Sequence, residues 1–211
     1  MKFHTFAKDI CPLMKIAVYL GSKPGNDPVF AENARLIGRY LAERGVEVIY
    51  GGASVGTMKA LAEGVVEAGG KLTGVFPRGF KGRVEFAEAG VDVRNLNPGK
   101  YSRYEFIETE NFDVRIRTME RMSDACIILP GSTGTMHEFF SYCEGNVLGD
   151  YRKPVGILNV SGYYDPLIGL FTNMKSRKFI GEKEIDCLRV SPSPRELVDA
   201  IVDALKEQGV S

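Results

Sequence analysis

Residues 125–136 read ACIILPGSTGTM, an apolar run followed at once by a glycine-rich corner. Residues 46–58, VEVIYGGASVGTM, repeat the arrangement of strand-forming residues, then glycines, then Gly-Thr. Short apolar runs bounded by glycine are typical of buried strands, and in both stretches Gly-Thr stands where a helix would begin. The two stretches therefore predict strand-to-helix corners in a mainly parallel sheet that is covered on both faces.

Outward from these corners, apolar runs alternate with helical patterns along the chain. Ala34, Ile37 and Leu41 recur at spacings of three and four before Gly45, which favours the end of a helix. The predicted strands are Lys15–Leu20, Val46–Tyr50, Lys71–Phe76, Glu105–Glu108, Cys126–Leu129, Val155–Asn159 and about Leu188–Val190. The predicted helices are Pro28–Arg44, Gly56–Ala68, Asn111–Met122, one from about Thr135, Tyr164–Lys175 and a terminal helix opened by a capping box at Ser193. This alternation predicts one α/β domain at 15–211 behind an N-terminal extension at 1–14.

Composition excludes several classes of protein. The 211 residues carry 27 basic and 27 acidic side chains, so no nucleic acid polymer is expected as a partner. No apolar run approaches the roughly 18 residues that a membrane helix needs, and no signal peptide is recognisable. Four cysteines without a CxxC pair favour reduced thiols in a cytoplasmic protein, and no spacing matches a zinc site.

The glycine corners are suited to an anionic ligand. Open α/β sheets bind ligands beyond the carboxyl ends of their strands. A helix start there offers free N–H groups and the positive end of the helix dipole, and glycine permits close approach. Hydroxyls of Ser132, Thr133 and Thr135 would add donors to phosphate oxygens. The alternative is a pair of tight turns that need glycine, and the repetition of the corner favours phosphate.

The common nucleotide motifs are missing from the sequence. There is no GxxxxGK[ST], and no GxGxxG follows the first strand. The second strand ends in Tyr-Gly-Gly at 50–52 rather than in the acidic residue that holds an NAD ribose. A redox enzyme of the dinucleotide-binding type is therefore not expected.

Two charged residues are candidates for the chemistry. Glu138 stands three positions after Thr135, so both side chains project from one face of the predicted helix, toward a ligand in the corner. Arg115 lies on the preceding helix, where a guanidinium could reach phosphate or ribose, and Arg117 and Arg121 compete for this role. The alternative for Glu138 is a carboxylate that only stabilises the helix start.

At these residues the chain resembles a known family. GSKPGND at 21–27, YGGASVGTM at 50–58 and PGSTGTMHE at 130–138 are similar to stretches of the LONELY GUY family of cytokinin riboside 5′-monophosphate phosphoribohydrolases, whose signature is PGGxGTxxE. Other matching stretches are LAERGVEVIYGG at 41–52, MSDACIILPG at 122–131 and KPVGILNVSGYYDPL at 153–167. The likeness covers nearly the whole chain from Lys15 onward. It implies a Rossmann-like, doubly wound fold and a homodimer or higher oligomer.

The resemblance also implies an activity. A nucleoside 5′-monophosphate such as AMP is hydrolysed at its N-glycosidic bond to ribose 5-phosphate and a free base, adenine or an N6-substituted adenine. No cofactor and no metal are implied. Glu138 matches the signature glutamate and Arg115 the family arginine, so these two are the expected catalytic residues. The expected substrate- and phosphate-binding residues are Gly21, Ser22, Gly51, Gly52, Gly131, Ser132, Thr133, Gly134 and Thr135.

Departures from the family pattern leave a second interpretation open. Ser132 replaces the second signature glycine, and the family's MHERK reads FDVRI at 112–116. The stretch 78–104 is also longer than the usual connection. The alternative is therefore a non-catalytic carrier that binds a nucleotide or molybdenum cofactor on the same fold. Phe139, Phe140 and Tyr142 make the helix after Glu138 the candidate interface of an oligomer, with core packing as the alternative.

Overall fold

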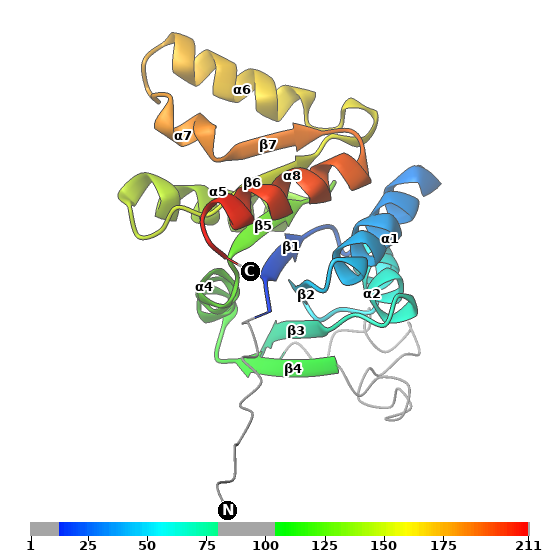
Figure 1. Cartoon of the computed structure of the whole chain (residues 1–211). Helices are drawn as coiled ribbons and strands as arrows, with labels where there is room; N and C mark the ends of the chain where they lie inside the picture. The colour runs from blue at the N-terminus through cyan, green and yellow to red at the C-terminus, as the bar shows by residue number, and fades with distance from the viewer. Residues whose placement is uncertain (1–12, 80–103, 211) are drawn as a thin grey trace, which may run out of the picture.

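The computed structural model describes residues 13–79 and 104–210, which form a seven-stranded sheet (Figure 1). The strands are β1 Lys15–Tyr19, β2 Glu47–Tyr50, β3 Leu72–Pro77, β4 Tyr104–Thr109, β5 Ala125–Ile128, β6 Val155–Leu158 and β7 Leu188–Ser191. Their order across the sheet is β4-β3-β2-β1-β5-β6-β7, and all neighbouring strands are parallel. The predicted doubly wound α/β fold is confirmed.

Helices connect the strands and begin largely where the sequence signals them. They are α1 Pro28–Glu43, α2 Gly56–Glu67, α4 Phe112–Met122, α5 Thr133–Leu148, α6 Asp165–Ser176, α7 Lys183–Asp186 and α8 Pro194–Glu207, with a short 3-10 turn, η3, at Val160–Gly162. The Asp27 carboxylate caps α1 by accepting from the Val29 N–H at 2.9 Å. The Asn111 side chain caps α4 in the same way, accepting from the Val114 N–H at 2.9 Å. Gly45 follows α1 at a φ of 71°, as a glycine at a helix end commonly does.

The helices cover both faces of the sheet, so successive residues of β1 enter different cores. Ile16 and Val18 pack in a cluster with residues of α1, α2 and α8. Ala17 and Tyr19 pack in a second cluster with residues of α4 and α5. Figure 1 shows α1 and α2 on one side of the sheet and α4 and α5 on the other. This burial on both faces explains why the strands read as continuous apolar runs.

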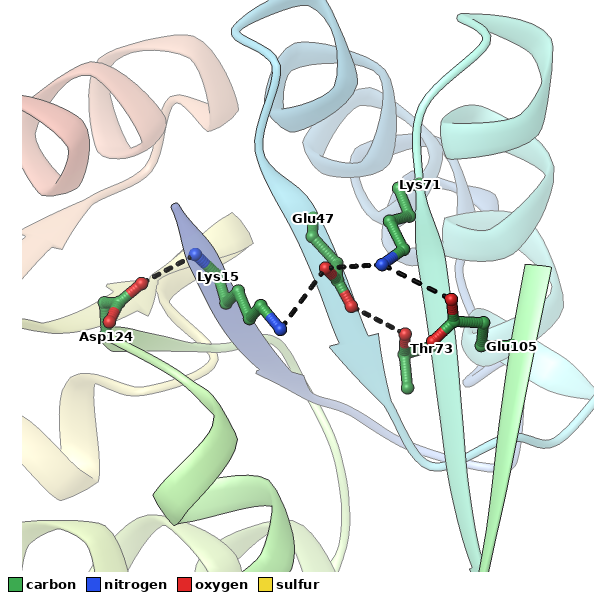
Figure 2. A network of polar contacts seen from close by, with 6 residues as sticks. All are labelled: Lys15, Glu47, Lys71, Thr73, Glu105 and Asp124. Carbon is green, nitrogen blue, oxygen red and sulfur yellow. Dashed lines mark hydrogen bonds and ion pairs between the residues drawn. The ribbon is translucent and has the colours of Figure 1, made fainter. Parts of the chain in front are cut away.

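A network of charged and polar side chains lies at the amino ends of the strands (Figure 2). Its centre is Glu47, which is 1% exposed. One carboxylate oxygen accepts from the Thr73 hydroxyl at 2.7 Å, and the other lies 3.1 Å from Lys71 Nζ and 3.6 Å from Lys15 Nζ. Lys71 Nζ also lies 3.4 Å from Glu105. Burial raises the pKa of Glu47, but these partners outweigh burial, so its pKa is lowered overall.

One helix start and one helix cap differ from the sequence prediction. Helix α5 begins at Thr133 rather than near Thr135, because Ser132 already has the extended backbone of an N-cap. The capping box of α8 is half formed: Ser193 accepts from the Glu196 N–H at 3.4 Å, but Glu196 does not bond back to it. The Ser191 hydroxyl instead donates to the Glu196 carboxylate and accepts from the Ser193 N–H, both at 3.0 Å.

Some predictions fall outside the described residues. These are the structure of 1–12 within the predicted extension, including Cys11, and of 80–103 within the irregular stretch 78–104. Among the helices that the structure describes, none is both long and apolar enough to cross a bilayer. Within the same residues, no group of three or more His, Cys, Asp or Glu side chains is placed to hold a metal ion.

Candidate functional site

The predicted site lies at the carboxyl ends of the central strands. Strands β1 to β4 follow one another outward in one direction, and strands β5 to β7 follow one another outward in the other. A crevice is therefore expected between the carboxyl ends of β1 and β5. Gly21 follows β1 and Pro130 follows β5, and the Gly21 N–H donates to the Pro130 carbonyl at 3.3 Å. The two predicted loops therefore meet at the topological switch point of the sheet.

The corner after β2 joins the same assembly. The Thr57 hydroxyl donates to the Gly21 carbonyl at 2.7 Å and links the start of α2 to the loop after β1. Gly56 has a φ of +53°, and a Cβ atom there would lie 2.4 Å from the Ser22 carbonyl oxygen. Only glycine accommodates both the conformation and this close approach. The structure thus brings the three predicted loops, at 21–22, 51–52 and 131–135, to one edge of the sheet.

Neither helix that begins at a glycine corner has a side-chain cap. Val55 precedes α2 and Ser132 precedes α5, and neither side chain bonds to the helix it precedes. Asp27, Asn111 and Ser193, in contrast, cap α1, α4 and α8. An uncapped helix start keeps its first N–H groups and its dipole available to an anion. Ser132, Thr133 and Gly134 are exposed there, whereas Thr135 is buried.

Arg115 and Glu138 form a buried ion pair beside these corners. Arg115 Nη1 donates to Glu138 Oε1 at 2.5 Å, and each side chain is 8% exposed. Arg115 Nε donates to the Val75 carbonyl at 2.9 Å, which anchors the guanidinium to β3. A charge-assisted contact of this kind is strong because both groups are shielded from water. The two side chains predicted to carry the chemistry are therefore in direct contact.

Burial raises the pKa of the Glu138 carboxyl above its usual value. The charges of Arg115 and His137 and the hydrogen bond from Arg115 oppose this rise. A buried carboxylate facing a ligand site is suited to stabilising a positive charge that develops during a reaction. Perturbed carboxyl groups of this kind are more common at functional sites than elsewhere, which supports Glu138 as the candidate.

The structure distinguishes between the competing arginines. Arg117 lines a groove of about 480 Å³ between residues of α4 and α5. Arg121 is exposed in the last turn of α4. Among these three arginines, Arg115 is therefore the one whose side chain reaches Glu138. The groove is lined by Asp113, Ile116, Arg117, His137, Phe140, Ser141 and Glu144.

The aromatic residues expected at an interface divide between core and surface. Phe139 and Tyr142 are fully buried against the sheet, so the interface prediction is wrong for these two, and core packing explains them. Phe140 is 40% exposed and stacks on Phe171 of α6, with ring centres 6.4 Å apart. The helical period explains the difference, because Phe140 projects about 100° away from Phe139.

Sequence reasoning missed two residues that shape the corners. The sequence places Thr57 in the second corner without indicating a role, but its hydroxyl links that corner to the loop after β1. Tyr163 follows η3, and its hydroxyl donates to the Gly131 carbonyl at 2.5 Å. A tyrosine pair just beyond a predicted strand was the available signal, since that position lies at the carboxyl edge of the sheet.

Known proteins are similar in sequence to most of this chain. The family described as "Possible lysine decarboxylase" matches residues 58–201. The rice (Oryza sativa subsp. japonica) protein "Probable cytokinin riboside 5′-monophosphate phosphoribohydrolase LOGL1" is 37% identical over 187 residues, which are 87% of this chain and 77% of the relative. Cytokinin riboside 5′-monophosphate phosphoribohydrolase LOG7 of Arabidopsis thaliana is 32% identical over 184 residues, 87% of this chain and 79% of the relative.

Solved structures show the same fold at lower identity. The molybdenum cofactor binding protein of Rippkaea orientalis superposes with a TM-score of 0.65 at 22% identity, over 92% of this chain and 98% of that one. The molybdenum cofactor carrier protein of Chlamydomonas reinhardtii gives 0.65 at 21% identity, over 92% and 99%. At this identity the likeness establishes the Rossmann-like fold, and the chemistry has to be argued from the site.

Proposed function

Because the chain belongs to the LONELY GUY family, we propose that it hydrolyses the N-glycosidic bond of a nucleoside 5′-monophosphate to free base and ribose 5-phosphate. The observation that carries the proposal is the buried contact between Arg115 and Glu138, beside the glycine corner at 51–52. The names of the curated relatives support adenine or an N6-substituted adenine as the base.

Glu138 has the main chemical role in this proposal. Cleavage of an N-glycosidic bond passes through a sugar with oxocarbenium character, and a carboxylate close to the sugar stabilises that positive charge. Water then forms a bond to C1′ of the ribose as the bond between C1′ and the base breaks, and the base leaves with a proton. Arg115 helps to keep Glu138 ionised and in position, because it opposes the effect of burial on the pKa of Glu138.

The 5′-phosphate would bind at the uncapped start of α5. Backbone N–H groups there and the exposed hydroxyls of Ser132 and Thr133 are suited to phosphate oxygens. Gly21, Ser22, Gly51 and Gly52 border the site from the neighbouring corners. Binding energy from the phosphate, which does not react, would hold the sugar against Glu138.

The test is an assay of base release from AMP and from N6-substituted AMP. Wild-type protein is expected to release base and ribose 5-phosphate in equal amounts. Glu138→Gln keeps the shape of the side chain and removes its charge, so kcat should fall about 100-fold or more. Ribose 5-phosphate should still bind to this variant, because the phosphate corner is intact.

The same assay distinguishes the hydrolase from the carrier. The buried, paired Glu138 favours hydrolysis, because a carrier has no need for a carboxylate with a raised pKa at its ligand. Tight binding of a nucleotide without release of base would support the carrier instead. If wild-type protein releases base from no nucleoside monophosphate, the hydrolase proposal is wrong. If Glu138→Gln releases base as fast as wild-type protein, the role assigned to Glu138 is wrong.

We also propose that the protein is a homodimer or a higher oligomer through α5. Phe140 and Val147 are seven residues apart on this helix, so they share one face, and they are 40% and 55% exposed. The neighbouring Leu148 is 70% exposed, and Leu170 of α6 is 41% exposed. Exposed apolar side chains on one face of a helix favour a protein partner over water.

A cytoplasmic location is proposed from the thiols. Cys126, Cys143 and Cys187 are all unpaired in the part of the chain that the structure describes. Free thiols persist in reducing compartments. Urea-unfolded protein, purified without reductant, should therefore bind a thiol reagent at all four cysteines of the sequence. A lower number that rises on reduction would reveal a disulfide and contradict this location.

A further inference from the structure

Successive carbonyl groups at the corner between β5 and α5 each accept a hydrogen bond from another segment. The pairs are Leu129 O with the Tyr164 hydroxyl at 2.6 Å, Pro130 O with the Gly21 N–H at 3.3 Å and Gly131 O with the Tyr163 hydroxyl at 2.5 Å. Two of the three donors are neighbouring tyrosines from the loop after β6. Carbonyl oxygens carry partial negative charge, so their direction decides whether the corner accepts an anion.

Because the peptide group is planar, a contact that fixes a carbonyl group also fixes the direction of the N–H group of the next residue. In a trans peptide the carbonyl of one residue and the N–H of the next point in opposite directions. No peptide bond in the described residues is cis. A donor that holds the Gly131 carbonyl therefore also sets the direction of the Ser132 N–H, at the N-cap of α5.

We propose that Tyr163 is a positioning residue for the phosphate corner. Its hydroxyl holds the Gly131 carbonyl and thereby orients the Ser132 N–H toward the ligand. This inference rests on the proposed function, since it assigns Tyr163 to the phosphate site of the same reaction. Tyr163 acts through the backbone and makes no contact with the reacting atoms in this proposal.

The ring of Tyr163 is held by two aromatic neighbours. The Phe30 ring of α1 packs edge-on at 5.9 Å between ring centres, and the Tyr164 ring packs edge-on at 5.0 Å. The preceding backbone is unusual, because Ser161 has a φ of +52° and Gly162 a φ of +72°. A non-glycine residue in this conformation is uncommon, and it persists where the surrounding structure requires it. These two residues directly precede Tyr163, whose hydroxyl reaches the Gly131 carbonyl.

Tyr164 provides a matched control for the hydroxyl of Tyr163. Its hydroxyl holds the Leu129 carbonyl, but the next residue is Pro130, which has no N–H to orient. Tyr164 is 3% exposed, whereas Tyr163 is 43% exposed. Loss of the Tyr164 hydroxyl should therefore affect stability, and loss of the Tyr163 hydroxyl should affect phosphate binding.

The experiment compares Tyr163→Phe with Tyr164→Phe by calorimetric titration with ribose 5-phosphate and with ribose as the probe without phosphate. Tyr163→Phe should raise the Kd for ribose 5-phosphate about three- to tenfold, because the Ser132 N–H would lose its hydrogen bond to the phosphate. Its affinity for ribose and its Tm should stay at the wild-type values. Tyr164→Phe should lower the Tm by a few degrees and leave the Kd for ribose 5-phosphate unchanged.

The same variants are then assayed with AMP, where Tyr163→Phe should raise KM and leave kcat within about twofold. An unchanged Kd in Tyr163→Phe, an equal rise in Tyr164→Phe, or wild-type protein that does not bind ribose 5-phosphate would overturn the inference. The two proposals fail separately. Wild-type protein that binds ribose 5-phosphate but releases no base contradicts the hydrolase alone, and the comparison of Kd values still decides the role of Tyr163.

Discussion

Nη2 of Arg115 lies 2.6 Å from the point that a Cβ atom on Gly51 would occupy. The guanidinium therefore fills space that any other residue at position 51 would need. Its remaining nitrogens are also engaged, with Nε bonded to the Val75 carbonyl and Nη1 to Glu138. The corner after β2, strand β3 and helix α5 together hold this one side chain in place.

Gly51→Ala should therefore displace Arg115 and reduce activity without unfolding the protein. A shift of about 1 Å in a positioned catalytic group can reduce kcat/KM about 100-fold, and a loss of about 10- to 100-fold is expected. Gly169→Ala is the control, because a Cβ atom there meets nothing within 4 Å inside α6. It should retain activity. Equal kcat/KM values for Gly51→Ala and wild-type protein would show that Arg115 need not be held at this point.

The pH dependence of turnover should report the raised pKa of Glu138. The proposed mechanism needs the ionised carboxylate, so kcat should fall as the pH is lowered through this pKa. The fall should lie at a higher pH than the value of about 4.3 that is typical of an exposed glutamate. Circular dichroism at each pH separates this effect from acid unfolding. An acid limb at or below the ordinary value contradicts the assignment of Glu138.

Glu47→Gln should reduce stability at neutral pH. The lowered pKa of Glu47 means that the folded protein favours its ionised form, so this stabilisation is present above the unfolded pKa of about 4.3. It is lost as the pH falls through the folded pKa. Hydrogen bonds to a charged group contribute about 1.5–3 kcal/mol, which is the expected loss in the free energy of unfolding at pH 7.

Urea unfolding at several pH values measures this difference, which should shrink as the pH falls below about 4. Glu105→Gln is the control, because Glu105 contacts the same Lys71 but its side chain is 60% exposed. Its effect should stay within about 0.5 kcal/mol. A difference between wild type and Glu47→Gln that does not vary with pH would contradict the role of the charge.

Phe140→Asp should weaken the proposed association through α5. A charge placed in an apolar interface has to be desolvated, so sedimentation at micromolar concentration should shift toward monomer. Val190→Asp is the control, since Val190 is similarly exposed, at 46%, but lies on β7. Wild-type protein that sediments only as a monomer would show that the apolar face of α5 has another role.

Local signals in the sequence predicted most of the fold. Asn111 and Gly45 mark helix ends where the structure has them, because a cap depends on a few neighbouring residues. The contacts of Glu47 could not be predicted in this way. They join residues 15, 47, 71 and 105, which become neighbours only once the order of the strands is known.

The candidate site was predictable to a similar degree. The corner at 130–135 and Glu138 follow from the pattern, whereas spacing alone left Arg115, Arg117 and Arg121 equivalent. Their difference depends on how α4 packs against β3 and α5, which turns Arg115 inward. The proposed role of Tyr163 depends on a hydrogen bond across more than thirty positions in the sequence. The tyrosine pair beyond the strand signals a place at the carboxyl edge of the sheet, but it does not identify Gly131 as the partner.

The network around Glu47 lies at the edge of the sheet opposite the glycine corners. The two groups of residues lie at opposite ends of the strands, so a substitution in a corner does not directly alter the contacts of Glu47. Selection can therefore change the ligand specificity of the corners without removing the stabilisation that the Glu47 network provides. Departures such as Ser132 in the corner are the kind of change that such a division tolerates.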